Sequence, residues 1–136
     1  MKASLKLLVR QRAKYCCEYC VAQERLSPDP FSSEHILPLA KGGTSDAENL
    51  ALACQRCNNL KHTFTHALDP ISGALVPLYN PRIDNWHSHF RWNKTFTVIH
   101  GITPIGRATI IRLQVNRQSL VNLRQVFTPL GLHPPF

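Results

Sequence analysis

Two Cys-x-x-Cys pairs constrain the fold of this chain more than any other feature of its sequence. The first pair is Cys17 and Cys20, and the second is Cys54 and Cys57. Each pair has the spacing at which two thiolates can bind one tetrahedral metal ion, and two such pairs flanking an intervening segment are typical of a zinc site. Zinc binding also supplies folding free energy, which so short a segment cannot obtain from a core. We therefore expect one structural Zn²⁺ held by these four cysteines.

The competing interpretation is that the cysteines form two disulfides or a redox pair. A disulfide framework belongs to secreted proteins, whereas residues 1–15 carry too many charges for a secretory leader. The fifth cysteine, Cys16, would lengthen the first pair to Cys-x-x-x-Cys if it replaced Cys17, and that spacing is less common in zinc sites. We expect Cys16 to be a free thiol.

Between and just after the cysteine pairs lies a second pattern, which contains Glu34-His35, Asn49 and Asn58. In full it reads Cys-x-x-Cys, acidic-His-Ile-x-Pro, Gly-Gly, Asn-Leu and Cys-x-x-Cys-Asn-x-x-Lys. This pattern resembles the HNH endonucleases, the zinc-stapled branch of the ββα-metal (His-Me finger) nucleases. The resemblance covers roughly the first half of the chain. Glu34 stands where Asp is more usual, and Asn58 replaces the last His of the H-N-H triplet, but both side chains keep an oxygen ligand.

The resemblance implies that the protein is a metal-dependent endonuclease. His35 would be the general base that activates water, because the ordinary pKa of histidine lies near neutrality. Glu34 and Asn58 would hold one catalytic Mg²⁺ or Mn²⁺, ions that prefer hard oxygen ligands. Asn49 would brace the intervening loop and orient His35 through its backbone or ring. Hydrolysis of a phosphodiester bond in this family leaves a 5′-phosphate and a 3′-hydroxyl.

Each of these residues also has a structural interpretation when it is considered alone. A single histidine at a strand is usually structural, Asn58 could cap the following helix, and Asn49 could make a turn. The alternative function is a zinc-dependent nucleic-acid-binding module without catalytic activity. Glu34, His35 and Asn58 together favour the enzyme, since a pure binding module has no use for that trio.

The charge of the chain indicates a polyanionic partner. The chain contains sixteen Lys and Arg residues and eight Asp and Glu residues, which gives a formal net charge of +8. Basic side chains release the counterions condensed on phosphates, although a merely soluble basic protein could carry the same charge. Together with the family resemblance, the charge makes nucleic acid, and specifically duplex DNA, the expected partner. No apolar run is long enough to span a membrane, and we expect a cytoplasmic protein. The candidate nucleic-acid contacts are Arg56, Lys61, His62, Arg82 and Arg91, with Lys94 and Arg107 as further basic positions.

The fold class we expect is α+β, with a ββα core in the first half. Helical spacing of apolar residues predicts a helix over 4–15. Two short apolar segments, 34–40 and 49–53, are predicted to be antiparallel strands, and the second cysteine pair to open a helix over 55–67. This helix would carry His62 and His66 one turn apart, as surface or phosphate-facing residues rather than zinc ligands.

The second half is predicted to be an extension made of strands and two helices. Strands are expected over 74–78 and 95–99, and helices over 107–116 and 118–127, with Thr103-Pro104 as the N-cap and first turn of the earlier helix. Trp86, Phe90 and Trp92 could stack on bases, but aromatics at this density favour a small core. We expect a single domain over 1–136, in which residues 68–136 pack on a nuclease core formed by residues 1–67.

Overall fold

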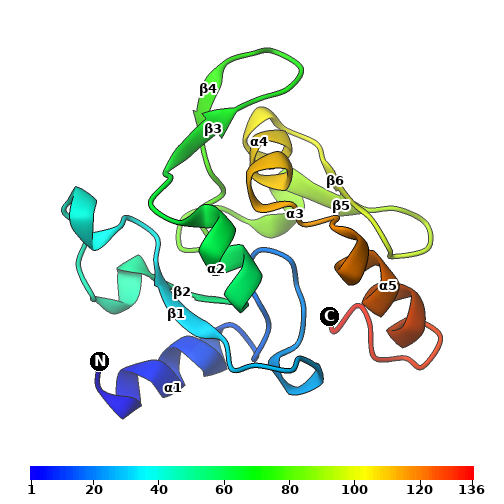
Figure 1. The fold of residues 1–136 in the computed structure, drawn as a ribbon, viewed down its shortest axis with the longest axis horizontal. Coiled ribbons are helices and arrows are strands. Elements are labelled where there is room, and N and C mark those ends of the chain that lie inside the picture. The colour runs from blue at the N-terminus through cyan, green and yellow to red at the C-terminus, as the bar shows by residue number, and fades with distance from the viewer. The chain divides into compact units, whose positions relative to one another are not determined.

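The computed structural model describes residues 1–136, and the chain in it divides into two compact units. The first unit contains Met1–Thr65 with Asn80–Ile83, and the second contains His66–Tyr79 with Asp84–Phe136. Both combine helices with short antiparallel strand pairs, so the expected α+β class is confirmed (Figure 1). None of the helices combines the length and the apolar character needed to cross a membrane.

The first unit opens with helix α1 (Ala3–Arg12), which is shorter than the predicted span of 4–15. The helix stops because Lys14 and Tyr15 adopt left-handed backbone angles, with φ of 54° and 58°. Val9 is buried, whereas Leu8, predicted on the same apolar stripe, is 44% exposed.

Strands β1 (Ser32–His35) and β2 (Leu50–Ala53) form an antiparallel pair in which His35 lies opposite Leu50. All four residues of β2 are buried, which makes this pair the centre of the first unit. Between the strands, the loop contains two short 3-10 turns, η2 (Leu39–Lys41) and η3 (Ala47–Asn49), where the sequence predicted longer strands.

Helix α2 (Gln55–Lys61) follows β2 and completes the ββα core (Figure 1). Cys54 caps it, because the Cys54 side chain accepts a hydrogen bond from the backbone N–H of Cys57. The helix ends well before the predicted residue 67, since His62 has a left-handed φ of 48°. His66 already begins the next strand, so His62 and His66 do not share a helix face, contrary to the sequence prediction.

The second unit contains two hairpins and three helices, where the sequence predicted two strands and two helices. Its elements are β3 (His66–Leu68), β4 (Leu75–Pro77), α3 (Trp86–His89), β5 (Phe90–Trp92), β6 (Ile99–Gly101), α4 (Pro104–Leu113) and α5 (Gln118–Phe127). The hairpins pair β3 with β4 and β5 with β6. Residues 95–98 of the strand predicted over 95–99 instead form the turn between β5 and β6, where Phe96 has a left-handed φ of 58°, and only Ile99 belongs to a strand.

Helix α4 begins as the sequence predicted. The Thr103 hydroxyl accepts a hydrogen bond from the backbone N–H of Gly106, and Pro104 occupies the first helical position. Gly106 must be a glycine, because a Cβ there would lie 2.1 Å from the carbonyl oxygen of His89. The helix ends at Leu113 rather than at residue 116, since Gln114 is left-handed.

The aromatic residues of the second unit pack on one another. The ring centroids of Trp86 and Phe90 lie 5.2 Å apart, and those of Trp86 and Trp92 lie 5.6 Å apart. Tyr79 meets Phe90 edge to face at 5.2 Å. This arrangement agrees with a small aromatic core rather than with a platform of separate rings for base stacking.

Candidate metal centre and active site

The four cysteines of the two Cys-x-x-Cys pairs converge on one point of the first unit. Their sulfur atoms all lie within 4.8 Å of one another, and all four residues are buried. A tetrahedral zinc ion with Zn–S distances of about 2.3 Å requires sulfur atoms roughly 3.8 Å apart. The Sγ atoms of Cys20 and Cys54 are 3.7 Å apart, which fits that requirement. The donor set and its geometry therefore fit a structural zinc ion.

Two tight turns bring the cysteines into this position. The backbone N–H of Cys20 points at the Cys17 sulfur (3.5 Å), and the N–H of Cys57 points at the Cys54 sulfur (3.4 Å). Burial raises the pKa of the Cys17 thiol, so a bound cation is needed to favour its thiolate form. A site closed by four thiolates leaves no open position for water or substrate.

Cys16 lies outside this cluster, as expected. Its thiol donates to the carbonyl oxygen of Lys14 at 3.3 Å. Burial raises the pKa of Cys16 to about 11, so this cysteine stays a neutral thiol at physiological pH.

His35 ends β1 and is only partly buried. Its Nε2 atom lies 2.9 Å from the hydroxyl oxygen of Ser45, which belongs to the loop between η2 and η3. The sequence analysis did not single out Ser45. Its position two residues after the Gly-Gly pair is a local feature, but only the folded loop shows that it meets the imidazole.

Asn49 braces the loop that carries Ser45. Its side-chain oxygen accepts from the backbone N–H of Leu37 (2.8 Å), and its amide donates to the carbonyl oxygens of Leu37 (2.9 Å) and Thr44 (2.8 Å). Gly43 fits against this brace only without a side chain, because a Cβ would lie 1.8 Å from the Leu37 carbonyl oxygen. Asn49 thus holds the loop, as the resemblance implied, while Ser45 rather than Asn49 contacts the His35 ring.

Glu34 lies on the opposite face of β1 from His35, because successive strand residues alternate. It is 4% exposed, and its Oε2 accepts a hydrogen bond of 2.7 Å from the Tyr19 hydroxyl. Its Oε1 forms an ion pair with the ammonium of Lys61. Burial raises the pKa of the Glu34 carboxyl, and the charge of Lys61 opposes that shift.

This environment does not fit Glu34 as a ligand of a catalytic Mg²⁺ or Mn²⁺. Both carboxylate oxygens are engaged, one by an ammonium and one by a hydroxyl. Asn58, the other expected ligand, lies on α2 with a half-buried side chain. It does not cap α2, since Cys54 does.

The candidate nucleic-acid contacts differ in accessibility. Arg56, His62 and Arg91 are exposed. Arg82 is partly buried and forms an ion pair with Glu18. Lys61 is only 1% exposed, and its ammonium forms an ion pair with Glu34 inside the first unit. This corrects the prediction that Lys61 reaches a phosphate.

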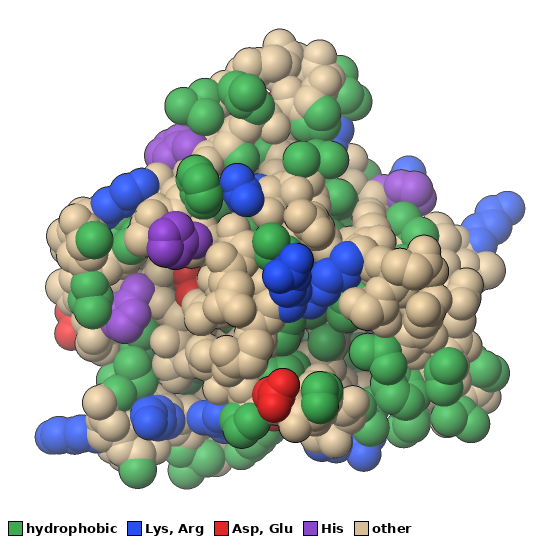
Figure 2. All heavy atoms as spheres, in the orientation of Figure 1, with side chains coloured by type: hydrophobic (Ala, Val, Ile, Leu, Met, Phe, Trp, Pro, Cys, Tyr) green, Lys and Arg blue, Asp and Glu red, His purple; other side chains and the backbone are tan.

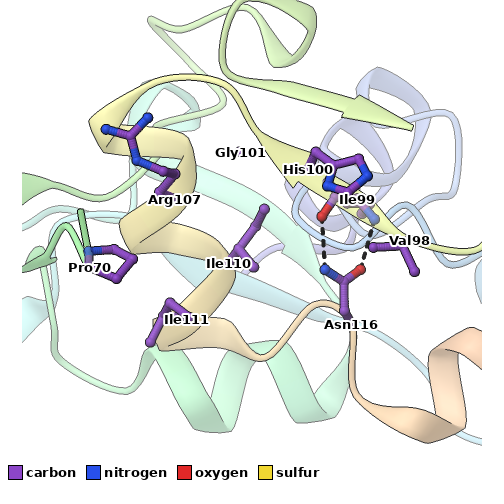
Figure 3. Close-up of a pocket in the computed structure, with 9 residues that line it drawn as sticks. All are labelled: Pro70, Val98, Ile99, His100, Gly101, Arg107, Ile110, Ile111 and Asn116. Atoms are coloured by element: carbon purple, nitrogen blue, oxygen red, sulfur yellow. Dashed lines mark hydrogen bonds between the residues drawn. The ribbon is translucent and has the colours of Figure 1, made fainter. Parts of the chain in front are cut away.

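The second unit contains a hollow of about 220 Å³ (Figure 3). Pro70, Ile110 and Ile111 line it together with Arg107, whose guanidinium is paired with Asp69. On its other side the Asn116 amide bonds both the N–H and the carbonyl oxygen of Ile99 (Figure 3). Arg107 and Asn116 are thus already engaged within the protein, and none of the lining residues belongs to the histidine–asparagine motif.

The first unit therefore has the build of a ββα module stapled by a four-cysteine metal site. The HNH endonuclease family model matches residues 17–64, from the first zinc cysteine to just beyond α2. The match confirms, over this segment, the resemblance seen in the sequence. No curated protein and no solved structure matches the chain.

Proposed function

We propose that the protein is an endonuclease that hydrolyses phosphodiester bonds of duplex DNA, with His35 as the general base. The observation that carries this proposal is the placement of His35. Its ring ends a strand of the HNH module, is partly accessible to solvent, and is held at one nitrogen by Ser45.

The contact with Ser45 suits a base. A neutral imidazole has one N–H donor and one nitrogen that accepts a proton. If Nε2–H donates to the Ser45 oxygen, the lone pair lies on Nδ1, which can take a proton from water. The resulting hydroxide would attack the phosphorus in line with the leaving oxygen, giving the 5′-phosphate and 3′-hydroxyl that the family resemblance implies.

The positive charge supports a nucleic-acid substrate. The formal net charge is +8, and Figure 2 shows a face on which Lys and Arg atoms cover more surface than Asp and Glu atoms. Arg56 and His62 are exposed in the same unit as His35, at the start of α2 and immediately after its end. We propose them, with the exposed Arg91, as phosphate contacts, whereas the guanidinium of Arg82 is paired with Glu18.

A divalent ion such as Mg²⁺ or Mn²⁺ is implied by the family resemblance, but Glu34 does not offer it a free carboxylate. Asn58, on α2, is the other ligand that the family resemblance implies. Whether the reaction requires such an ion is tested by comparing cleavage in Mg²⁺, in Mn²⁺ and in EDTA. The structural zinc is not a candidate catalyst, because four thiolates close its coordination.

The decisive experiment measures cleavage of supercoiled plasmid in Mg²⁺, in Mn²⁺ and in EDTA, with a limiting concentration of the protein and short incubation times. The His35→Ala variant lacks the base, so its cleavage rate should fall by at least roughly a hundredfold, while its zinc content and DNA affinity stay unchanged. His87→Ala is a matched control, because His87 is an exposed histidine of the other unit. A His35→Ala variant that cuts as fast as the parent would show that His35 is not the base.

The second candidate function is a zinc-dependent nucleic-acid-binding module without catalysis. The engagement of Glu34 by Lys61 and Tyr19 is the observation that favours it. Salt-dependent DNA binding by a parent protein that cleaves in none of the three conditions would establish this second function instead.

A further inference from the structure

Three polar side chains meet in the interior of the first unit, on the face of β1 opposite His35. Tyr19 is 2% exposed, Glu34 is 4% exposed and Lys61 is 1% exposed. Each comes from a different element: the turn of the first cysteine pair, strand β1 and the last position of α2. Burial of a charged pair is costly unless every charge finds partners, so the contacts of this cluster can be checked one by one.

Every polar group of the cluster is engaged. A lysine ammonium has three N–H donors. Lys61 places them near three oxygens: Oε1 of Glu34, the carbonyl of Ile36 at 2.9 Å and the carbonyl of His35 at 3.4 Å. The contact with Oε1 is an ion pair rather than a directed hydrogen bond.

The second carboxylate oxygen of Glu34 is bound by Tyr19, a residue of the first cysteine pair's turn. Oε2 of Glu34 accepts a hydrogen bond of 2.7 Å from the Tyr19 hydroxyl. Burial and the negative charge of Glu34 raise the pKa of Tyr19, so this hydroxyl keeps its proton and remains a donor. The carboxylate therefore has one positive and one neutral partner, and no oxygen is left over for a metal ion.

The cluster is tied to the zinc centre at both ends. Tyr19 lies between the ligands Cys17 and Cys20, and Lys61 lies one helical turn after the ligand Cys57. The two carbonyls that Lys61 holds belong to His35 and the residue after it. A continuous chain of contacts thus runs from the zinc-binding turns to the backbone of the proposed base.

We propose that Tyr19, Glu34 and Lys61 form a clamp that positions His35, and that the Lys61 ammonium, not a divalent cation, neutralises Glu34. A metal ion bound to Glu34 would have to displace Lys61 and leave a buried ammonium without its counter-charge, which is strongly unfavourable. Glu34 and Lys61 are then positioning residues. The effect on catalysis rests on the proposed function, whereas the clamp itself does not.

The first test is a double-mutant cycle on zinc-loaded protein, with no Mg²⁺ or Mn²⁺ added. Glu34→Gln and Lys61→Met each remove one charge, and the combined variant removes both while keeping the volume. If the two side chains form a clamp, the double variant should be more stable than the sum of the two single effects predicts. The difference should be at least roughly tenfold in the folding equilibrium constant. Additive effects would overturn the proposal, because a metal ligand and a separate lysine have no reason to be coupled.

The cycle stays informative if the single variants do not fold. Recovery of folded, zinc-loaded protein in the double variant is then the expected result, and failure of the double variant as well contradicts the clamp. Glu48→Gln is the matched control, since Glu48 is exposed in the same unit. Tyr19→Phe, which removes only the hydroxyl, should destabilise mildly and keep full zinc content.

The second test separates a positioning role from a metal-ligand role. In this test Mn²⁺ alone is added to the protein, and the spin-resonance signal of the free ion measures how much is bound. The binding curve should be the same for the parent and for the double variant that combines Glu34→Gln with Lys61→Met. Loss of Mn²⁺ binding on Glu34→Gln would overturn the proposal. In a cleavage assay, the clamp variants should lower kcat without changing the Mn²⁺ concentration that gives half-maximal rate. The cycle and the titration do not require cleavage, so they can succeed or fail independently of the proposed nuclease activity.

Discussion

Ser45 is the residue whose role depends most on a single contact. Its hydroxyl lies 2.9 Å from Nε2 of His35, and the Asn49 amide holds the carbonyl of the preceding residue, Thr44. The asparagine of the motif therefore acts on the histidine indirectly, by holding the loop that presents Ser45.

We expect Ser45→Ala to lower kcat by about three- to tenfold, because an ordinary hydrogen bond contributes about 0.5–1.5 kcal/mol. KM should change little, since Ser45 positions the ring rather than the substrate. Ser45→Thr keeps a hydroxyl and should restore most of the rate. Steady-state kinetics of the two variants test this, and equal loss in both would assign Ser45 a general structural role.

Among the elements, helix α4 and hairpin β3–β4 are joined by a buried carboxylate. Asp69, in the turn after β3, receives two hydrogen bonds from the Arg107 guanidinium at 2.8 and 2.9 Å. Ser72 adds bonds from its hydroxyl and its backbone N–H. Arg107 first, and Ser72 next, hold the pKa of Asp69 well below its usual range. This pairing leaves Arg107 a structural residue of the second unit rather than a free phosphate contact.

This depressed pKa predicts the pH dependence of stability. A carboxyl whose pKa is lower in the folded state stabilises the fold fully above its unfolded pKa of about 4 and loses that contribution as pH falls. Asp69→Asn should therefore be less stable than the parent at neutral pH, and the difference should shrink steadily below about pH 4. Denaturant unfolding between pH 7 and pH 2 measures this; a difference that does not vary with pH would contradict the ion pair.

At the scale of the whole molecule, the two units differ in what stabilises them. The first is built around four cysteines and the buried strand β2, whereas the second has its own apolar core, with Phe90, Ile99 and Leu113 almost completely buried. We therefore expect the first unit, but not the second, to depend on a bound zinc ion for its stability.

We expect Cys54→Ser to lose the zinc ion and to unfold the first unit selectively. Amide hydrogen exchange should accelerate in β1, β2 and α2 and stay slow in β6 and α4, because metal binding energy is folding energy only where the ligands lie. Cys16→Ser is the control and should keep one zinc per chain. Equal loss of protection in both units would show that the second unit does not fold independently of the metal.

Features that depend on neighbours along the chain can be predicted from the sequence. Cysteine spacing predicted the four-sulfur cluster, Thr103-Pro104 predicted the start of α4, and apolar periodicity predicted α5 over 118–127, as observed. The sequence predicted the ends of α1 and α2 several residues too late. Both helices end before residues with left-handed backbone angles, such as Tyr15 and His62, and because these are not glycines the sequence does not indicate the helix end.

Which polar side chains meet depends on the packing of the folded chain and could not be predicted from the sequence. Glu34 and Lys61 lie 27 positions apart, and nothing local in either segment says that a lysine expected at the surface will be buried against that carboxylate. Ser45 and His35 meet because a braced loop folds back on the strand. Spacing of a few residues is fixed by helix and turn geometry, whereas contacts across the fold depend on how β1, α2 and the loop pack, and that packing is a property of all the side chains together.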